Sequence, residues 1–371
     1  MKEIYDAIPP HCFNSSAMRS LFYFARDVGY ISIPVYTSSF IQYIQGMCFT
    51  GIWILAHECG HGAFSKYKKL NLAMGLLMHS FLLVPFYSWR ITHGAHHKGT
   101  GNLEKDTAFV PRSRKAWAEA NFGTGADTAR AELSHLAEDA PLVFLWNCLM
   151  HQLLGWPGYL LFNDSPFWKK DQLPLIVLSN IAVMRMIVML ATGRYFFGFV
   201  EMLLAITFLH HMDGSLPHYQ NSTWTFVRGA TATIDRDFGF INKHLFHNIV
   251  GTHICHHLIS TIPFYHTREA SIAIRKVMGR HYRSNTKTSF MTAFWKTSKE
   301  RKFIEESVDG SGVRFFRNLH GVDHMTCDVN LRKRVTEAKG ILFAAPNEPS
   351  NRWIHLYGPL RRIRSMCAEA E

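Results

Sequence analysis

Long apolar stretches alternate with polar stretches along this 371-residue chain. Residues 30–56 contain no charged side chain, and about 20 apolar residues are enough to cross the hydrocarbon core of a bilayer. Residues 173–192 form a second apolar run with Arg185 inside it, and residues 195–209 form a shorter run interrupted by Glu201. We therefore predict an all-α integral membrane protein with about three to four transmembrane helices, which include these three runs.

Three groups of histidines lie at the ends of apolar runs or in polar segments. They are His57 and His61 in an H-x-x-x-H pattern, and His93, His96, His97 and His253, His256, His257 in two H-x-x-H-H patterns. Residues three and four apart share one face of a helix, so each group can direct its rings into one small volume. A single histidine is more simply interpreted as a solvated loop side chain, but the combination predicts a metal site.

The size of this set bears on the metal. Eight imidazoles exceed what one ion needs and favour two metal ions, although imidazole suits zinc, copper, iron and nickel alike. The seven cysteines are scattered without a C-x-x-C pair, so neither a structural zinc site nor a disulfide framework is indicated, and a reducing compartment is expected. A redox metal beside a bilayer suggests oxygen chemistry on a lipid chain.

Two other apolar stretches are predicted to lie in the membrane interface or to re-enter the bilayer, namely residues 70–87 and 141–162. A single crossing by residues 70–87 would put the first two histidine groups on opposite sides of the membrane. His79 and Pro85 make a re-entrant course plausible for this stretch, and Gly155, Pro157 and Gly158 break the other. We expect a cytosolic segment at residues 1–29, a membrane domain at 30–300 whose cytosolic helical cap carries the di-metal site, and a tail at 301–371.

Charge and the N-terminal sequence give further expectations. Forty Lys and Arg against 28 Asp and Glu give a net charge of +12, which fits cytoplasmic membrane-facing loops better than nucleic acid, for which no motif is found. The first residues contain no apolar signal-peptide core, so insertion is expected to use internal segments. The sequon at Asn221 is predicted to be cytosolic and unglycosylated.

Several stretches resemble the membrane fatty acid desaturases. HECGHGAFS, WRITHGAHHKGTGNLEKDTAFVPR and THICHHLISTIPFY are similar to the three histidine boxes of that family, in particular its fungal and plant Δ12 (oleate) branch; DAIPPHCF, LPHY and WTFVRGATATIDRDFGF add to the likeness. The resemblance implies a multi-pass, oxygen-dependent enzyme of the endoplasmic reticulum with two iron ions on the cytosolic side. Its reaction would introduce a cis double bond into an acyl chain, with Δ12 desaturation of oleate to linoleate favoured.

The resemblance also implies partners and a ligand set. The substrate would be a fatty acyl lipid or acyl-CoA, and electrons would come from a separate cytochrome b5 and its reductase, because no HPGG haem motif is present. The eight histidines above are carried over as ligands, together with His211 of ITFLHHMDGSLPHY, whereas His210 is assigned no role. No catalytic residue beyond the ligands is expected. Side chains that could support the ligands are Glu58, Asp106, His218, Asp237 and His247, although loop, capping or structural roles compete for each.

Other functions share this pattern. A fatty acyl hydroxylase, or a desaturase acting at another position, would use the same ligands. A non-catalytic, divergent or truncated paralogue would explain why the chain has apolar length for one span before the first box, where the family has two. A histidine-rich metal transporter would instead place its histidines within the spans.

Overall fold

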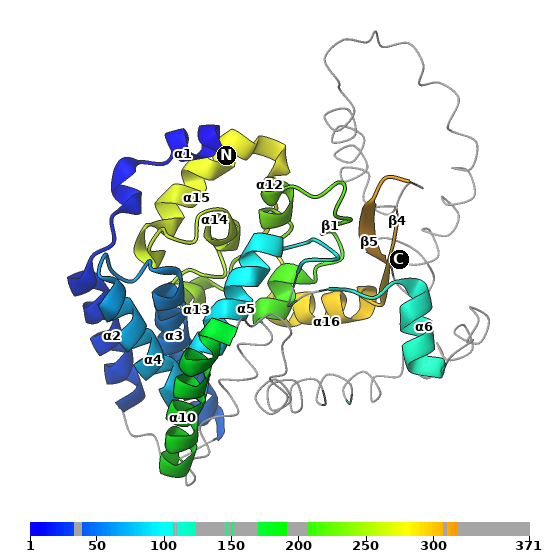
Figure 1. The fold of residues 1–371 in the computed structure, drawn as a ribbon. Helices are drawn as coiled ribbons and strands as arrows, with labels where there is room; N and C mark the ends of the chain where they lie inside the picture. The colour runs from blue at the N-terminus through cyan, green and yellow to red at the C-terminus, as the bar shows by residue number, and fades with distance from the viewer. Residues whose placement is uncertain are drawn as a thin grey trace, which may run out of the picture.

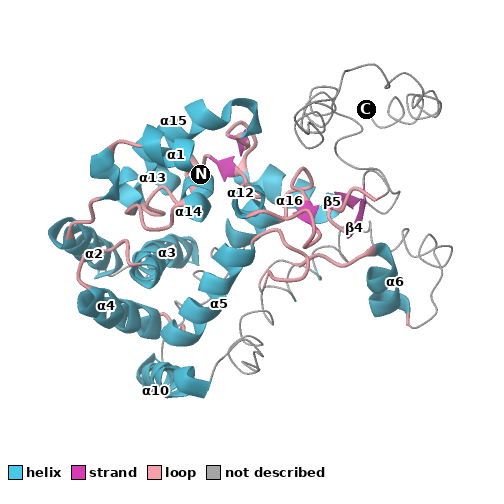
Figure 2. Ribbon diagram, turned by 45° about the horizontal axis from the view of Figure 1, so that its top comes forward, coloured by secondary structure: helices cyan, strands magenta, loops and turns pink. Residues whose placement is uncertain are grey.

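The computed structural model describes residues 1–32, 39–106, 108, 110–123, 146, 150, 170–190, 206–306 and 310–317. Within these ranges the protein is mostly helical, as Figures 1 and 2 show. Most of the predicted segment 141–162 and most of 195–209 lie outside the described residues, as does the chain beyond residue 317.

Five helices form the half of the molecule that contains the first two histidine groups. They are α2 (Ala17–Ser32), α3 (Ser39–His61), α4 (Lys68–Phe81), α5 (Phe86–Gly99) and α10 (Leu173–Leu190). α3 packs against α2 and α4, while α10 packs against α4 and α5 (Figure 1). The buried side chains Ile52 and Leu55 of α3 belong to the core of this half, which also includes Met78 of α4 and Phe246.

Two chain reversals place the histidine helices against each other. α3 ends at His61, and Gly62 follows with a φ of +80°, a left-handed conformation that glycine adopts without steric cost. α5 begins directly after Pro85, whose missing N–H costs nothing at a helix start. In the last turn of α3, a Cβ on Gly60 would come within 2.7 Å of the Trp89 ring, so α3 and α5 approach closely beside the histidines.

Helix length and hydropathy determine which helices could cross a membrane. Among the described residues, no single helix is both long and apolar enough to count as a candidate span, but α4 and α5 qualify as a pair that is bent by 106°. α10 covers most of the predicted span 173–192 and carries a row of exposed apolar side chains: Leu173, Leu175, Val177, Leu178, Ile181 and Met184.

The other half contains α12 (Phe226–Ala230), α13 (Gly239–His244), α14 (His253–Leu258), α15 (Phe264–Met278) and α16 (Phe290–Glu300). The N-terminal arm consists of α1 (Lys2–Ala7) and the 3-10 helix η1 (Pro10–Phe13), and it lies along α15 (Figure 1). Ile4, Ile8 and Cys12 of this arm join a buried apolar cluster with residues of α14 and α15.

Two small sheets correct the all-α prediction. β1 (His218–Tyr219), β5 (Val313–Arg317) and β4 (Phe303–Glu306) form an antiparallel sheet in the order β1-β5-β4, with Tyr219 opposite Val313. β2 (Asp235–Arg236) pairs in parallel with β3 (Ser284–Asn285). The beginning of the predicted tail is therefore joined to the preceding residues through strand pairing.

The region of Asp235 also differs from expectation. In the sequence, Asp235 and Asp237 on either side of Arg236 predict the start of a helix, because acidic residues favour a helix N-terminus, but Asp235 lies in β2. Helix α13 begins later, at Gly239, whose N–H donates to Asp237 Oδ1 over 2.8 Å.

Candidate metal centre

Three helices bring the predicted histidine groups to one place. The last turn of α3 carries His57 and His61, the second half of α5 carries the next group, and α14 carries the third. In each case the spacing of three or four residues puts the rings on one side of the helix. The structure thus brings together side chains that are up to 200 positions apart in the sequence (257 minus 57).

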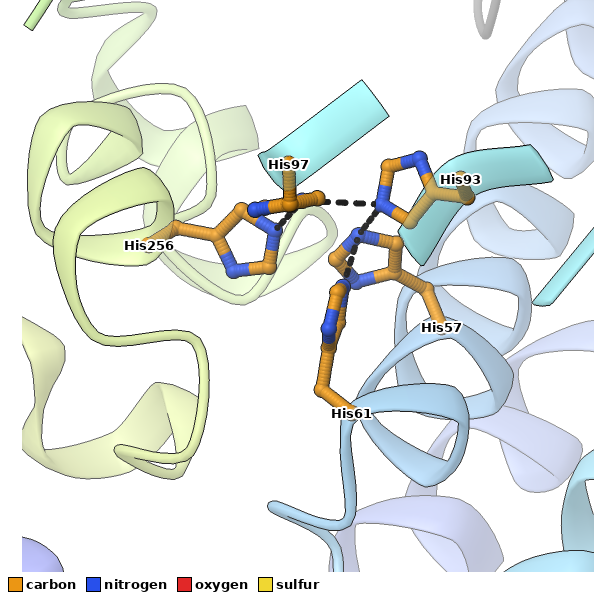
Figure 3. A group of neighbouring side chains, drawn as sticks. All are labelled: His57, His61, His93, His97 and His256. Carbon is orange, nitrogen blue, oxygen red and sulfur yellow. Dashed lines mark hydrogen bonds between the residues drawn. The ribbon is translucent and has the colours of Figure 1, made fainter. Parts of the chain in front are cut away.

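The first set of rings comprises five histidines (Figure 3): His57, His61, His93, His97 and His256. Each offers one ring nitrogen, and these nitrogens all lie within 4.8 Å of one another. The Nε2 atom of His93 is 2.9 Å from that of His57 and 3.0 Å from that of His97. The Nε2 atom of His256 lies 3.1 Å from that of His97, so α14 supplies the fifth ring of this set.

A second set lies directly beside the first and consists of His96, His211 and His257, all buried. The Nε2 atom of His211 is 3.2 Å from that of His257 and 3.1 Å from the Nε2 atom of His253. The rings of His97 and His257 stack with centroids 4.2 Å apart, which places the two sets in contact. The nine predicted ligands therefore form one cluster. It consists of the five histidines of the first set, the three of the second, and His253, which contacts the second set through His211.

The chemistry of this donor set suits metal ions. Facing Nε2 atoms at about 3 Å present several lone pairs to one point, and neutral imidazole is a ligand for iron, zinc, copper and nickel. Burial, reinforced by the neighbouring imidazoles, lowers the pKa of His253, His256 and His257 well below the ordinary value. These rings are therefore neutral at physiological pH, the form that binds a metal.

Two side chains in the loop after α5 orient ligand rings. His96 Nδ1 donates to Asp106 Oδ1 over 2.7 Å, so the proton sits on Nδ1 and Nε2 faces the cluster. His257 Nδ1 lies 3.2 Å from the hydroxyl of Thr100, which itself donates to the His96 carbonyl over 2.7 Å. That hydroxyl can then accept the His257 Nδ1–H, which leaves His257 Nε2 free to bind.

Asp106 is itself held in place. Its carboxylate accepts the N–H groups of Gly101 and Ala108 over 3.1 and 3.0 Å. Burial alone would raise the pKa of Asp106, but the hydrogen bonds from His96 and from these N–H groups outweigh it and lower that pKa. The group is thus an anion at neutral pH, which strengthens its hold on His96.

Two further carboxyl groups position the helices. Glu58 is buried, lies 3.8 Å from His57 Nδ1, and accepts the N–H of Phe264 over 3.1 Å, which ties α3 to the start of α15. Asp235 accepts the Ile254 N–H over 3.0 Å and the Tyr282 hydroxyl, and so fixes the first turn of α14. Thr100 carried no sequence signal, and for Asp235 the sequence favoured a loop or capping role over one in supporting the ligands.

The remaining predicted residues lie outside the two sets. His218 lies in β1 with its ring against Phe316, and Asp237, just before α13, accepts the N–H of Gly239. His247 Nε2 bonds Asp27 over 2.7 Å. The ring of His210, which was assigned no role, lies between the carbonyl oxygens of Ile206 and Val250, 2.6 and 3.0 Å away.

Comparison with known proteins identifies the class. The model of the fatty acid desaturase family matches residues 34–288, which is more than half of the chain, so this protein belongs to that family. It is therefore an oxidoreductase that acts on fatty acids, in a family of membrane-bound, metal-dependent enzymes, and the predicted resemblance is confirmed.

Three relatives show which enzymes of this family have similar sequences. An oleate hydroxylase from Claviceps purpurea is 37% identical, over 86% of this chain and 80% of the relative. A Δ(12) fatty acid desaturase from Mortierella alpina is 36% identical, over 85% of this chain and 90% of the relative. The Δ(12)-fatty-acid desaturase of Arabidopsis thaliana is 34% identical, over 85% and 91%.

Proposed function

We propose that this protein is a Δ12 fatty acid desaturase that converts oleate to linoleate. The observation that carries the proposal is the pair of contiguous histidine sets, contributed by α3, α5, α14 and the segment before β1. The Δ12 desaturases of fungi and plants among the relatives support the position of the double bond.

The ligands in this proposal are the nine histidines of the cluster, and the ions are two irons. The first set would hold one ion and the second set, with His253, the other. Nitrogen-only ligation fits iron but does not single it out, and the choice of iron and of two ions follows the family resemblance and the size of the cluster. When bound, the iron pair would activate O2 for the removal of hydrogen from the acyl chain.

The overall reaction consumes the acyl –CH2–CH2– unit, O2, two electrons and two protons, and yields –CH=CH– and two molecules of water. The protein must hold one methylene pair at the ligand cluster, because an error of about 1 Å in placement can cost about a hundredfold in rate. Asp106 and Thr100 keep two rings oriented, and Glu58 and Asp235 fix the helices that carry the others. His61 and His93 are only partly buried, so we assign the access of substrate to this side of the first set.

The setting of the enzyme is part of the same proposal. It would be a multi-pass protein of the endoplasmic reticulum with its site on the cytosolic side, in which residues 1–29 precede a membrane domain at 30–300 and a tail at 301–371. The substrate would be an acyl lipid or acyl-CoA. Electrons would come from cytochrome b5 and its reductase, and the net charge of +12 would favour an acidic carrier.

Expression in a yeast that makes oleate but no linoleate tests the proposal. Gas chromatography of total fatty acids should reveal linoleate with the wild-type chain and none with His256→Ala at equal membrane protein. Ricinoleate as the main product would indicate that the protein is a hydroxylase and not a desaturase. A hydroxylase is the second candidate function, and the oleate hydroxylase of Claviceps purpurea among the relatives favours it. Full-length protein in the membrane without either product would refute both enzymes.

A further inference from the structure

A second group of metal-ligating side chains lies where the N-terminal arm meets α15, outside the histidine cluster. We call it the arm site; its members are His11, Cys12, His266 and Glu269. Each member offers one ligand atom, and these atoms all lie within 4.8 Å of one another. His11 Nε2 is 2.9 Å from Glu269 Oε2 and 3.8 Å from Cys12 Sγ, and the rings of His11 and His266 meet edge to face.

Local structure explains how two short segments supply four donors. His266 and Glu269 are three residues apart on α15 and so share one face of that helix. His11 and Cys12 are adjacent in η1, which lies against α15. Ligands of a tetrahedral zinc ion at about 2.0–2.3 Å stand about 3.3–3.8 Å apart, so the observed spacing needs only small side-chain adjustments to enclose an ion.

Two simpler explanations cover parts of the arm site. The pair of His11 and Glu269 could be a surface ion pair, since both side chains are about half exposed (54% and 51%), and such pairs contribute little. Cys12 could be buried only for packing, because it shares an apolar cluster with Ile4 and Ile8. Neither explanation accounts for a buried thiol, two imidazoles and a carboxylate meeting within 4.8 Å.

We propose that the arm site binds one divalent ion of the zinc class and thereby fastens the N-terminal arm to α15. Thiolate, imidazole and carboxylate are the three side-chain ligands that zinc takes in proteins, and the thiolate disfavours magnesium and calcium. The ion would be structural. The arm packs against the cluster that includes Ile254 and Leu258 of α14, so the fastening would steady the helix that carries the third histidine group.

The acid–base state of the members fits this assignment. Burial raises the pKa of the Cys12 thiol to about 11, so the free thiol is protonated, and zinc would displace that proton to form the thiolate bond. Burial and the charge of Arg19 lower the pKa of His266, which keeps this imidazole neutral and able to ligate.

Cobalt(II) binding to the purified full-length protein in detergent tests the proposal. Cobalt replaces zinc in such sites, and a thiolate ligand produces an intense charge-transfer absorption in the near ultraviolet. The histidine cluster contains no cysteine among its proposed ligands, so this absorption does not come from that cluster. We expect one equivalent of cobalt to develop the band and added zinc to abolish it.

Variants locate the signal. Cys12→Ser should remove the band, whereas Cys255→Ser, which changes a buried cysteine of α14, should leave it unchanged. Because Cys12→Ser could also disturb folding, His266→Gln and Glu269→Gln provide a second test at less buried positions. Each should keep the thiolate band but weaken cobalt affinity at least tenfold.

Three results would overturn the proposal: no thiolate band in the wild type, a band that survives Cys12→Ser, or unchanged affinity in both His266→Gln and Glu269→Gln. Linoleate formation is scored separately in yeast, so loss of the band leaves the desaturase proposal standing, and absence of linoleate leaves the arm site standing.

Discussion

The substitution Asp106→Asn tests whether the Asp106 carboxylate is needed for metal binding and activity when all the histidines are retained. Asp106 Oδ1 accepts both His96 Nδ1–H and the Ala108 N–H, and Oδ2 accepts the Gly101 N–H. An amide has one oxygen, so its NH2 group would face either His96 or a backbone N–H, donor against donor. The substitution keeps the shape, removes the charge and releases the His96 ring.

The expected loss follows from the removed contact. A hydrogen bond to a charged group contributes about 1.5–3 kcal/mol, and loss of a carboxylate that orients a ligand histidine costs about 10–100-fold in metal affinity or activity. We expect linoleate formation in yeast to fall by about this factor, and iron per chain to fall from two towards one, because His96 belongs to the second set only. Elemental analysis of the purified protein and fatty acid profiles measure the two effects.

Asp237→Asn is the matched control, because Asp237 also accepts a backbone N–H, that of Gly239, but lies outside the histidine sets. It should leave iron content and linoleate unchanged. If Asp106→Asn retains wild-type iron and wild-type product, the assigned orientation of His96 is wrong. If both variants lose activity equally, the effect is general and not a property of the site.

Three other predictions concern the site and its surroundings. Thr100→Val removes the hydroxyl beside His257 Nδ1, and we expect about a tenfold loss of linoleate at equal protein level, which wild-type activity would contradict. Gly60→Ala would put a Cβ 2.7 Å from an indole ring of α5 and should destabilise the fold by about 1–3 kcal/mol. The control is Gly94→Ala on α5, whose Cβ would meet nothing within 4 Å. Thermal unfolding in detergent compares the two variants, and equal unfolding midpoints would contradict the close packing of α3 and α5. The sequon at Asn221 should carry no glycan, and a mass shift on endoglycosidase treatment of microsomal protein would contradict a cytosolic site.

Helical spacing made the histidine groups predictable, because three- and four-residue intervals alone put His57 with His61 and His253 with His256 on shared faces. Their meeting across three helices could be expected only through the family resemblance. Thr100 and Asp235 act through contacts made by distant segments, the rings and N–H groups of α14. The local sequence therefore gave no sign of the role of Thr100 and favoured a loop or capping role for Asp235.

The sheets escaped prediction for a related reason. β1 and β2 contain two residues each, too few for a period-two pattern, and they exist because distant segments pair with them. The arm site is another case: His11 and Cys12 lie 254 residues or more from His266 (266 minus 12), and a single pair three residues apart, such as His266 and Glu269, does not indicate a metal site by itself.

The iron content of the purified full-length protein tests the central claim most directly. We predict about two iron atoms per chain in protein reconstituted under reducing conditions, falling to one or fewer in a variant that replaces both His93 and His97, with the fold retained by circular dichroism. Folded wild-type protein that binds no iron, or a double variant that keeps the full amount, would contradict the account.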